Sequence, residues 1–441
     1  MPPKGKGTCK KKGNSEKIKN RAPNPTSDCI NSHGKIICNI LSRLPVKTLL
    51  QFRCVCKKWR STISNSKFII THFQHSSSLQ RTNSSILIKT RHSDSESSYH
   101  ALSQFDTLQS SIVELDNPFP YFIPHMYILG PCNGIMCFYQ PPWGDVITLW
   151  NPSMRRSRMV KLSETKPLKG VHTFVSVGLA FDHQENDFLI LRIFCVSPTI
   201  HDVPNHVEMC SMKSLGVKGF PIRWEKLKNE MVFYTLRYNC DTIIKGVPYW
   251  LAYINDIVLR QTLVRFDVGK MVLEKLPVPP VIRAGDYKHY LANFEDSPGM
   301  FVLEKRVGFC IDVWVMDEED GWSKKCNIGP LLGIDRILGC LWNGNIVAEN
   351  YDNKLLVLFD PVTNSVKAGL EIDNAKKGSY MIFNYSESLH LVEGMLTVKR
   401  QDVLTHGLLR VIQRTRKEGK TLSVGKGGSE KRLGTNGHFE L

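Results

Sequence analysis

A repeated pattern of turns and short apolar strands constrains the fold of this 441-residue chain most strongly. Each copy has a glycine turn, a strand, a variable loop, a second strand and a closing Asn or Asp turn. Glycine supplies the positive φ that a tight hairpin needs, and Asp or Asn caps the closing turn. The three copies run from Gly134 to Asn151, from Gly246 to Asp267 and from Gly344 to Asp360.

Partial copies between these three extend the pattern into a regular series. The equivalent points are Asn151, Lys213, Asp267, Asp317 and Asp360, with spacings of 62, 54, 50 and 43 residues. Repeats of this length are typical of propeller blades, each of which is a small antiparallel sheet. Because one such sheet cannot bury both faces alone, neighbouring units stack, and we expect recognition at the loops on the rims.

Two sets of side chains within the repeats invite a functional interpretation, and we expect a structural role for both. Four aspartates end equivalent hairpins, where turn capping explains them better than a shared metal site. Four tryptophans fall on predicted strands and are expected in the blade cores. These residues are Asp182, Asp267, Asp317 and Asp360, and Trp150, Trp250, Trp314 and Trp342.

The apolar spacing near the N-terminus is helical instead. Ile37, Ile40, Leu41 and Leu44 share one helix face, and Pro45 ends that helix and begins a second. A third helix follows over residues 57–64. Three helices of this size cannot bury their apolar faces alone, so we expect one face to pack on the rest of the chain or on another protein.

The charge of the chain is concentrated at its two ends. The sequence has 58 Lys and Arg against 41 Asp and Glu, a formal net charge of +17. Residues 1–21 contribute +7 and residues 399–441 contribute +6, so the body is nearly neutral. Polar residues surround these basic runs, which favours flexible tails over a folded nucleic-acid-binding face.

The composition also indicates where the protein is located and which chemical activities it lacks the motifs for. The chain has no apolar run of membrane-spanning length and no secretory signal at its start, so we expect a cytoplasmic or nuclear protein with no membrane partner. Its 13 cysteines lack metal-ligand spacing and are expected to be reduced thiols, with no metal or other cofactor. No sequence signature of a catalytic nucleophile, zinc protease or phosphate-binding loop is complete, so we expect no enzyme activity.

Residues 40–64, Ile-Leu-Ser-Arg-Leu-Pro-Val-Lys-Thr-Leu-Leu-Gln-Phe-Arg-Cys-Val-Cys-Lys-Lys-Trp-Arg-Ser-Thr-Ile-Ser, closely resemble the F-box of plant F-box proteins. The β-rich body is similar to the F-box-associated domain that follows this module in the family. The matching segments are residues 130–134, 149–155, 177–182, 312–316 and 358–361. The sequence departs from the family pattern in two places. Ser32-His33-Gly34-Lys35 replace its opening, and Cys56 replaces the Ser that caps the third helix, so we expect that cap to be lost.

The resemblance implies a function and a set of contact residues. In this family the F-box docks a Skp-type adaptor, and through it a cullin, while the second domain holds a target protein for ubiquitination and degradation. The implied fold is α plus all-β, a three-helix F-box followed by a kelch-like β-propeller with basic tails. The implied adaptor-binding residues are Ile40, Leu44, Pro45, Leu49, Leu50, Val55 and Trp59, and target-binding residues are unknown.

The expected domains follow from these patterns. They are a basic tail over 1–32, the F-box over 33–73, a Ser-rich linker over 74–85, the propeller over 86–398 and a second basic tail over 399–441. Three alternatives remain: a nucleic-acid-binding propeller that uses the tails, a propeller enzyme, and a recogniser of a self-incompatibility ribonuclease.

Overall fold

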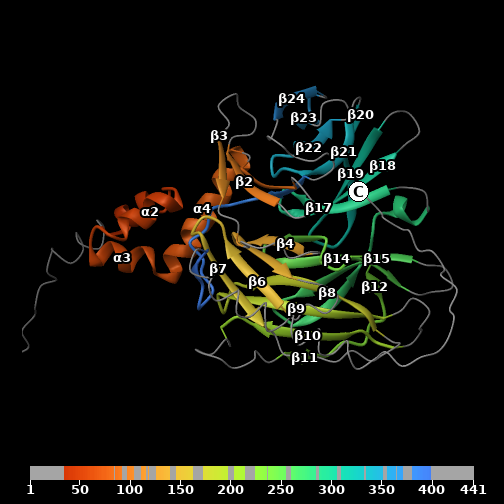
Figure 1. Cartoon of the computed structure of the whole chain (residues 1–441). Coiled ribbons are helices and arrows are strands. Elements are labelled where there is room, and N and C mark those ends of the chain that lie inside the picture. Colours follow the sequence, from red (N-terminus) through yellow and green to blue (C-terminus); the bar gives the residue numbers. More distant parts are fainter. Residues whose placement is uncertain are drawn as a thin grey trace, which may run out of the picture.

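The computed structural model describes most of residues 34–398 and shows a helical module beside six antiparallel sheets (Figure 1). The described ranges are 34–83, 85–91, 97–103, 111–115, 118, 126–139, 146–161, 172–196, 203–213, 224–235, 237–254, 260–284, 288–304, 309–331, 334–350, 355–363, 365–370 and 380–398. The predicted class, a small helical module followed by an all-β propeller, is confirmed. The two tails lie outside the described residues.

Four helices form the module. The first includes residues 34–41 and is followed by α2 (Val46–Phe52), α3 (Lys57–Ile63) and α4 (Ser66–Asn83). The predicted linker over 74–85 is therefore mostly helical, and α4 runs through its serines. Packing explains this difference, because buried Phe68 and His72 fix α4 against its neighbours and override the modest helix propensity of serine.

The cysteine at position 56 does cap α3. Its Sγ accepts a hydrogen bond from the backbone N–H of Trp59 at 3.4 Å. A thiol is a weaker acceptor than the hydroxyl of serine, so the cap expected to be lost is weakened instead.

Six sheets surround a common axis. Their strand orders are β25-β1-β2-β3, β26-β7-β6-β5-β4, β11-β10-β9-β8, β12-β14-β15-β16 with β13 also on β14, β17-β18-β19-β20, and β21-β22-β23-β24. The strands of the first three sheets are β1 (Ile86–Arg91), β2 (Ser97–Ser103), β3 (Ser111–Leu115), β4 (Tyr127–Cys132), β5 (Ile135–Tyr139), β6 (Val146–Asn151), β7 (Arg156–Lys161), β8 (His172–Asp182), β9 (Asp187–Val196), β10 (His206–Ser211), β11 (Glu225–Leu227), β25 (Met381–Asn384) and β26 (Leu396–Thr397). Those of the other three are β12 (Tyr234–Thr235), β13 (Thr242–Ile244), β14 (Val247–Ile254), β15 (Arg260–Asp267), β16 (Val272–Leu276), β17 (Lys288–Phe294), β18 (Ser297–Glu304), β19 (Phe309–Met316), β20 (Trp322–Leu331), β21 (Ile334–Cys340), β22 (Ile346–Asn350), β23 (Leu356–Asp360) and β24 (Ser365–Leu370), with a short 3-10 helix over Pro280–Ala284.

The end of the described chain closes the ring. Strand β25 pairs antiparallel with β1 and forms the inner strand of the first sheet. Strand β26 pairs with β7 and adds a fifth strand to the second sheet. Residues 385–395 connect these two strands, so one segment of chain holds two neighbouring blades.

The sequence repeat marks the third strand of five sheets. Asn151, Asp267 and Asp360 end β6, β15 and β23, while Lys213 and Asp317 closely follow β10 and β19. The four aspartates cap turns as predicted, with Oδ1 of each accepting backbone N–H groups two to four residues later. The first sheet was not found from the sequence, because its inner strand comes from the opposite end of the chain.

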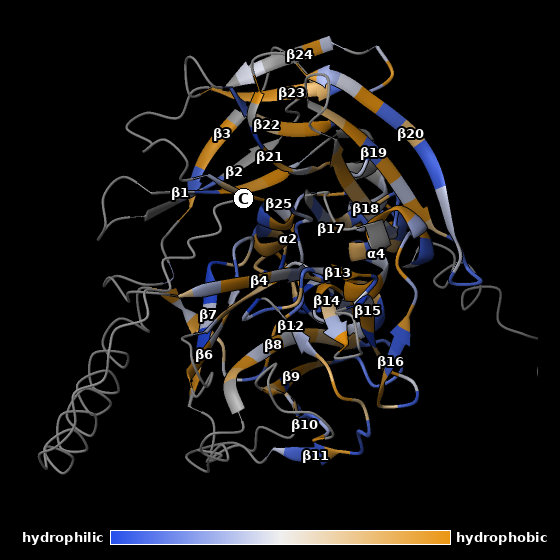
Figure 2. Ribbon diagram, turned by 90° about the vertical axis from the view of Figure 1, so that its right-hand side faces the viewer, coloured by the Kyte–Doolittle hydropathy of each residue, from blue (hydrophilic) through white to orange (hydrophobic). Residues whose placement is uncertain are grey.

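Apolar residues between the sheets form the propeller core. Trp150 and Trp250 are completely buried there as predicted, whereas Trp314 and Trp342 are half-buried. The outer strand β11 is largely hydrophilic, whereas β22 and β23 are largely hydrophobic (Figure 2). In the part of the chain that the structure describes, every cysteine is a free thiol, and no helix is long and apolar enough to cross a membrane.

Candidate functional site

The helical module projects from one side of the propeller, with α4 nearest to the sheets and α2 and α3 farther out (Figure 1). Its core consists of Leu41, Val46, Leu49, Ile63 and Phe68 together with two side chains of the propeller domain. These are Met154, in the turn after β6, and Leu389, between β25 and β26. The module therefore completes its core with residues of the propeller.

Polar contacts hold the same junction. Glu387 Oε2 accepts a hydrogen bond from the backbone N–H of Val46 at 2.9 Å. Because Pro45 makes no side-chain cap at this helix start, the carboxylate of Glu387 supplies one from a distant part of the chain. Ser77 on α4 donates to Ser386 at 3.4 Å. The segment that closes the ring therefore also holds the helices.

Two buried histidines lie where α4 meets this segment. His72 Nε2 lies 2.9 Å from the carbonyl oxygen of Leu44, and His390 Nδ1 lies 2.8 Å from Ser388 Oγ. The rings of Phe73 and Phe181 pack edge-on against His390. Burial lowers the pKa of both histidines, and burial together with the nearby His183 and His72 lowers that of His390 to about 4. Both imidazoles are therefore neutral at neutral pH.

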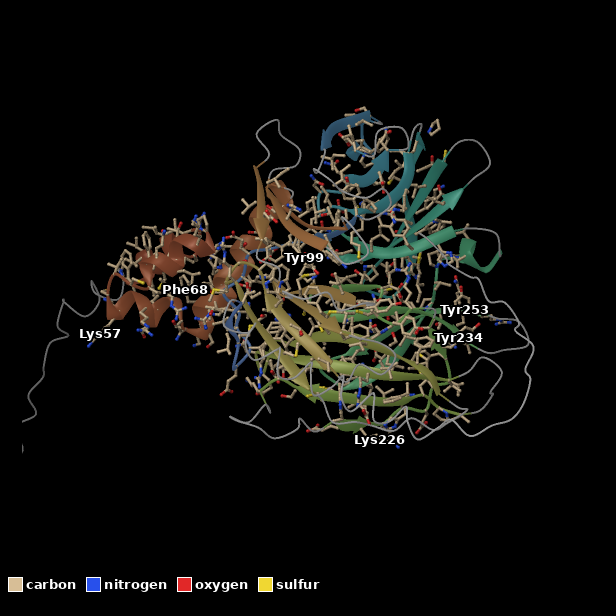
Figure 3. The ribbon with its side chains drawn as sticks, viewed as in Figure 1. Lys57, Phe68, Tyr99, Lys226, Tyr234 and Tyr253 are labelled. Atoms are coloured by element: carbon tan, nitrogen blue, oxygen red, sulfur yellow. The ribbon has the colours of Figure 1, made fainter. Side chains whose placement is uncertain are left out.

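The module also exposes three large apolar side chains. The exposed fractions are 58% for Ile36, 58% for Ile40 and 64% for Val55. Ile36 and Ile40 are four residues apart and share one face of the first helix. Lys57, at the start of α3, lies at the end of the module farthest from the sheets (Figure 3). The exposed surface of the module thus combines apolar and basic residues.

The seven residues expected to bind an adaptor divide into three groups. Ile40, Pro45 and Val55 are exposed. Leu44, Leu50 and Trp59 are half-buried, and the Trp59 ring packs against Phe52 at 5.0 Å between centroids. Leu49 is completely buried and offers no surface in this conformation, so its contribution is to packing. An adaptor contact by the other six stays a prediction.

A groove of about 980 Å³ lies between the first helix, α3 and α4. Ile37, Trp59 and Phe68 supply its apolar lining, and Phe68 lies between the helices (Figure 3). Four basic residues also line it: Lys35, Arg43, Lys58 and Lys67. The groove was not predicted, because the pairing of the first helix with α4 depends on a helix that the sequence pattern did not reveal.

The charged residues of the helical module are all basic. Residues 34–83 contain nine Lys and Arg and no Asp or Glu. A surface of this kind attracts acidic partners and repels basic ones, and salt weakens both effects. The signal was present in the sequence, but the larger charge of the two tails obscured it.

A second hollow lies on the propeller axis. It has a volume of about 450 Å³ and is lined by β4, β13, β17, β21 and β25, with Phe73 of α4 also in its wall. Within the described residues, no group of three or more His, Cys, Asp or Glu is arranged to hold a metal ion. The geometry offers two candidate sites: the surface of the helices and this axial cavity.

Comparison with known families agrees with both parts of the structure. The F-box domain matches residues 35–71, and the F-box associated beta propeller domain matches residues 85–389, more than two thirds of the chain. The chain belongs to the F-box-associated β-propeller family. This F-box protein therefore carries the docking module and the propeller that the sequence resemblance implied, and the combination supports a general role in substrate recognition.

Similar proteins are found in Arabidopsis thaliana. F-box/kelch-repeat protein At3g23880 is 24% identical over 310 residues, which cover 68% of this chain and 80% of that protein. Putative F-box protein At3g10240 is 24% identical over 350 residues, which cover 75% and 82%. Among solved structures, TolB from Acinetobacter baumannii aligns with a TM-score of 0.37 and 12% identity over 72% of this chain and 73% of that one, a likeness too low to bear on function.

Proposed function

We propose that this F-box protein is the substrate-recognition subunit of an SCF-type ubiquitin ligase, in which the helices bind a Skp-type adaptor and the propeller binds a target. The adaptor links the protein to a cullin. Tethering raises the effective concentration of target lysines near a ubiquitin-charged enzyme, so the protein needs no chemistry of its own.

The observation that carries the proposal is the exposure of Ile40 and Val55 on a module whose core is completed by residues of the propeller. Exposed apolar side chains on a small, firmly mounted module are typical of a docking surface. The lysines and arginines around them favour an adaptor with an acidic surface. A basic module also attracts nucleic acid, and the exposed apolar residues favour a protein partner instead.

The test is capture of a purified Skp-type adaptor by the full chain. Ile40→Asp with Val55→Asp places two carboxylates on the exposed surface without touching the core. Val362→Asp is the matched control, since Val362 is 91% exposed on the turn after β23. We expect the double variant to lose the adaptor and the control to retain it. Equal capture by all three proteins would contradict the proposed surface.

A further inference from the structure

The axial cavity is built by inner strands that run in the same direction. Near the start of β21, Arg336 Nη2 donates to the carbonyl oxygen of Tyr380, just before β25, at 3.2 Å. At the other end, Asn384 Nδ2 donates to the carbonyl oxygen of Cys340, the last residue of β21, at 2.8 Å. The cavity therefore has two distinct ends. Ser386 and Phe73 lie at the second end, on the side of the helices.

The wall carries hydrogen-bonding groups that the protein leaves unused. Each of three asparagines in the wall uses one amide atom: Asn239 Nδ2 donates to Cys240, Asn384 Nδ2 donates to Cys340, and Asn293 Oδ1 accepts from Asp296. The other amide atom of each has no protein partner within the described part of the chain and is open to water or to an occupant of the cavity. The indole N–H of Trp342, another wall residue, is buried without a partner there as well. The buried indole N–H is costly unless water or a ligand meets it, whereas the open amide atoms are available to either.

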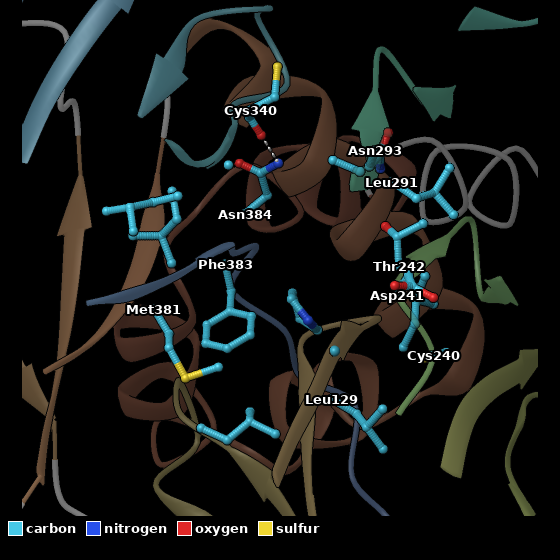
Figure 4. A pocket seen from close by; sticks show the side chains of 18 of the residues that line it. Leu129, Cys240, Asp241, Thr242, Leu291, Asn293, Cys340, Met381, Phe383 and Asn384 are labelled. Carbon is cyan, nitrogen blue, oxygen red and sulfur yellow. Dashed lines mark hydrogen bonds between the residues drawn. The ribbon is translucent and has the colours of Figure 1, made fainter. Parts of the chain in front are cut away.

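The rest of the wall is apolar and partly aromatic. Figure 4 shows Met381 and Phe383 on one side of the opening, and Leu291 across it with the polar Asn293 and Thr242. A cavity of about 450 Å³ falls within the range of ligand pockets and is too large for a single ordered water.

The charges of the wall are already neutralised. Arg237 Nε lies 3.3 Å from Asp241 Oδ1, and Arg336 Nη2 lies 3.3 Å from Glu349 Oε2. A charged ligand would lose its hydration without gaining a counter-charge, which is unfavourable. An uncharged ligand avoids this cost.

From these observations we propose that the axial cavity binds an uncharged ligand that joins a planar apolar body to amide or hydroxyl groups. A free small molecule and an uncharged segment of a target protein share this chemistry. Because Phe73 belongs to α4, an occupant at that end also contacts the F-box module. The proposal does not depend on adaptor binding.

The test uses the full chain and fluorine NMR of N-acetyl-4-fluoro-L-phenylalaninamide, which has a planar ring and two amides. We expect its resonance to broaden on addition of the protein and to recover on addition of unlabelled N-acetyl-L-phenylalaninamide. N-acetyl-4-fluoro-L-phenylalanine, which differs by a carboxylate, should not broaden. Stronger binding of 4-fluorobenzamide would indicate a free small molecule as the natural source, and stronger binding of the peptide-like probe would indicate a target chain.

Two variants test whether the probe binds in the axial cavity. Thr242→Phe fills the cavity from β13, and Met381→Trp fills it from a half-exposed position on β25. We expect each to weaken binding by about tenfold or more, while Val362→Trp, on an exposed turn, leaves binding unchanged. Adaptor capture by both variants should equal that of the wild type, which separates this proposal from the proposed function. No broadening with the wild-type chain, or equal broadening with both cavity variants, would overturn the proposal.

Discussion

Glu387 accepts a hydrogen bond from the backbone N–H of Val46 at 2.9 Å, although the two residues are 341 positions apart. Strand β25 ends three residues before Glu387, and Leu389, two residues after it, enters the helical core. The same short segment thus closes the propeller, caps α2 and completes the F-box module. We infer that the module and the propeller unfold together.

Removing the cap tests this connection. Glu387→Ala should lower the free energy of unfolding by about 1 kcal/mol, the usual value of a helix N-cap. Urea unfolding of the full chain measures the change. Glu393→Ala is the control, since its side chain is exposed on the same segment. An effect of Glu393→Ala as large as that of Glu387→Ala would show that the cap contributes nothing specific.

Leu389 gives a stronger test. Leu389→Ala removes buried volume from the helical core and should cost about 2–5 kcal/mol. Leu391→Ala changes the same residue type at a position that is 40% exposed and should cost less than about 1 kcal/mol. Amide hydrogen exchange should show faster exchange in residues 34–63 for the first variant alone. Faster exchange confined to the sheets would contradict a shared core.

The burial of His390 predicts a pH dependence. Its pKa is lowered from near 6.5 to about 4, mainly by burial and then by His183 and His72. Between these two values the unfolded chain binds more protons than the folded chain. The free energy of unfolding should therefore fall as the pH drops from 6.5 towards 4, by up to about 1.4 kcal/mol per pH unit.

Urea unfolding between pH 7.5 and pH 4.5 measures this slope. His390→Gln cannot ionise and should show a flatter profile than the wild type over the same range. His183→Gln removes a second cause of the lowered pKa of His390, so its profile should lie between those of the wild type and His390→Gln. Identical profiles for the wild type and His390→Gln would mean that His390 does not carry the effect.

Close packing between two blades predicts that a larger residue at Gly178 destabilises the propeller. A Cβ atom on Gly178 would lie 2.4 Å from Cζ2 of Trp250, whose ring is completely buried. Gly178→Ala should therefore destabilise the propeller by about 1–3 kcal/mol. At Gly369 on β24 the nearest side-chain atom would be 3.6 Å away, so Gly369→Ala should be tolerated. Thermal unfolding of the two variants gives the comparison.

The repeat was predictable because its signals are local. A turn glycine and a capping aspartate act within a few residues, so Gly246 and Asp267 marked a blade without knowledge of the rest of the chain. The first blade and the fifth strand of the second depend on β25 and β26, which pair with strands hundreds of residues away. No local pattern reveals such a pairing.

The helical module shows the same limit. Periodicity grouped Leu49 and Val55 as apolar residues of short helices, and both were expected to contact an adaptor. The structure separates them, since Leu49 is buried and Val55 is exposed. The difference depends on Met154 and Leu389, which cover one side of the module and leave the other open. Sequence spacing alone does not tell which side that is.

The basic charge of the helical module predicts that adaptor binding depends on salt. With nine basic residues and no acidic residue in 34–83, the affinity for a Skp-type adaptor should fall as salt is raised. Calorimetric titration between 50 and 500 mM NaCl, on the order of the range over which screening changes most, measures the dependence. Replacement of Lys35 and Lys58 by Gln should reduce it. An affinity independent of salt would exclude electrostatic attraction as a contributor.

Hydrogen exchange of the full chain, with and without a purified Skp-type adaptor, tests the central claim most directly. The account predicts slower exchange in residues 34–63 on adaptor binding and unchanged exchange in β8 to β24. Slower exchange in those strands, with none in the helices, would contradict it.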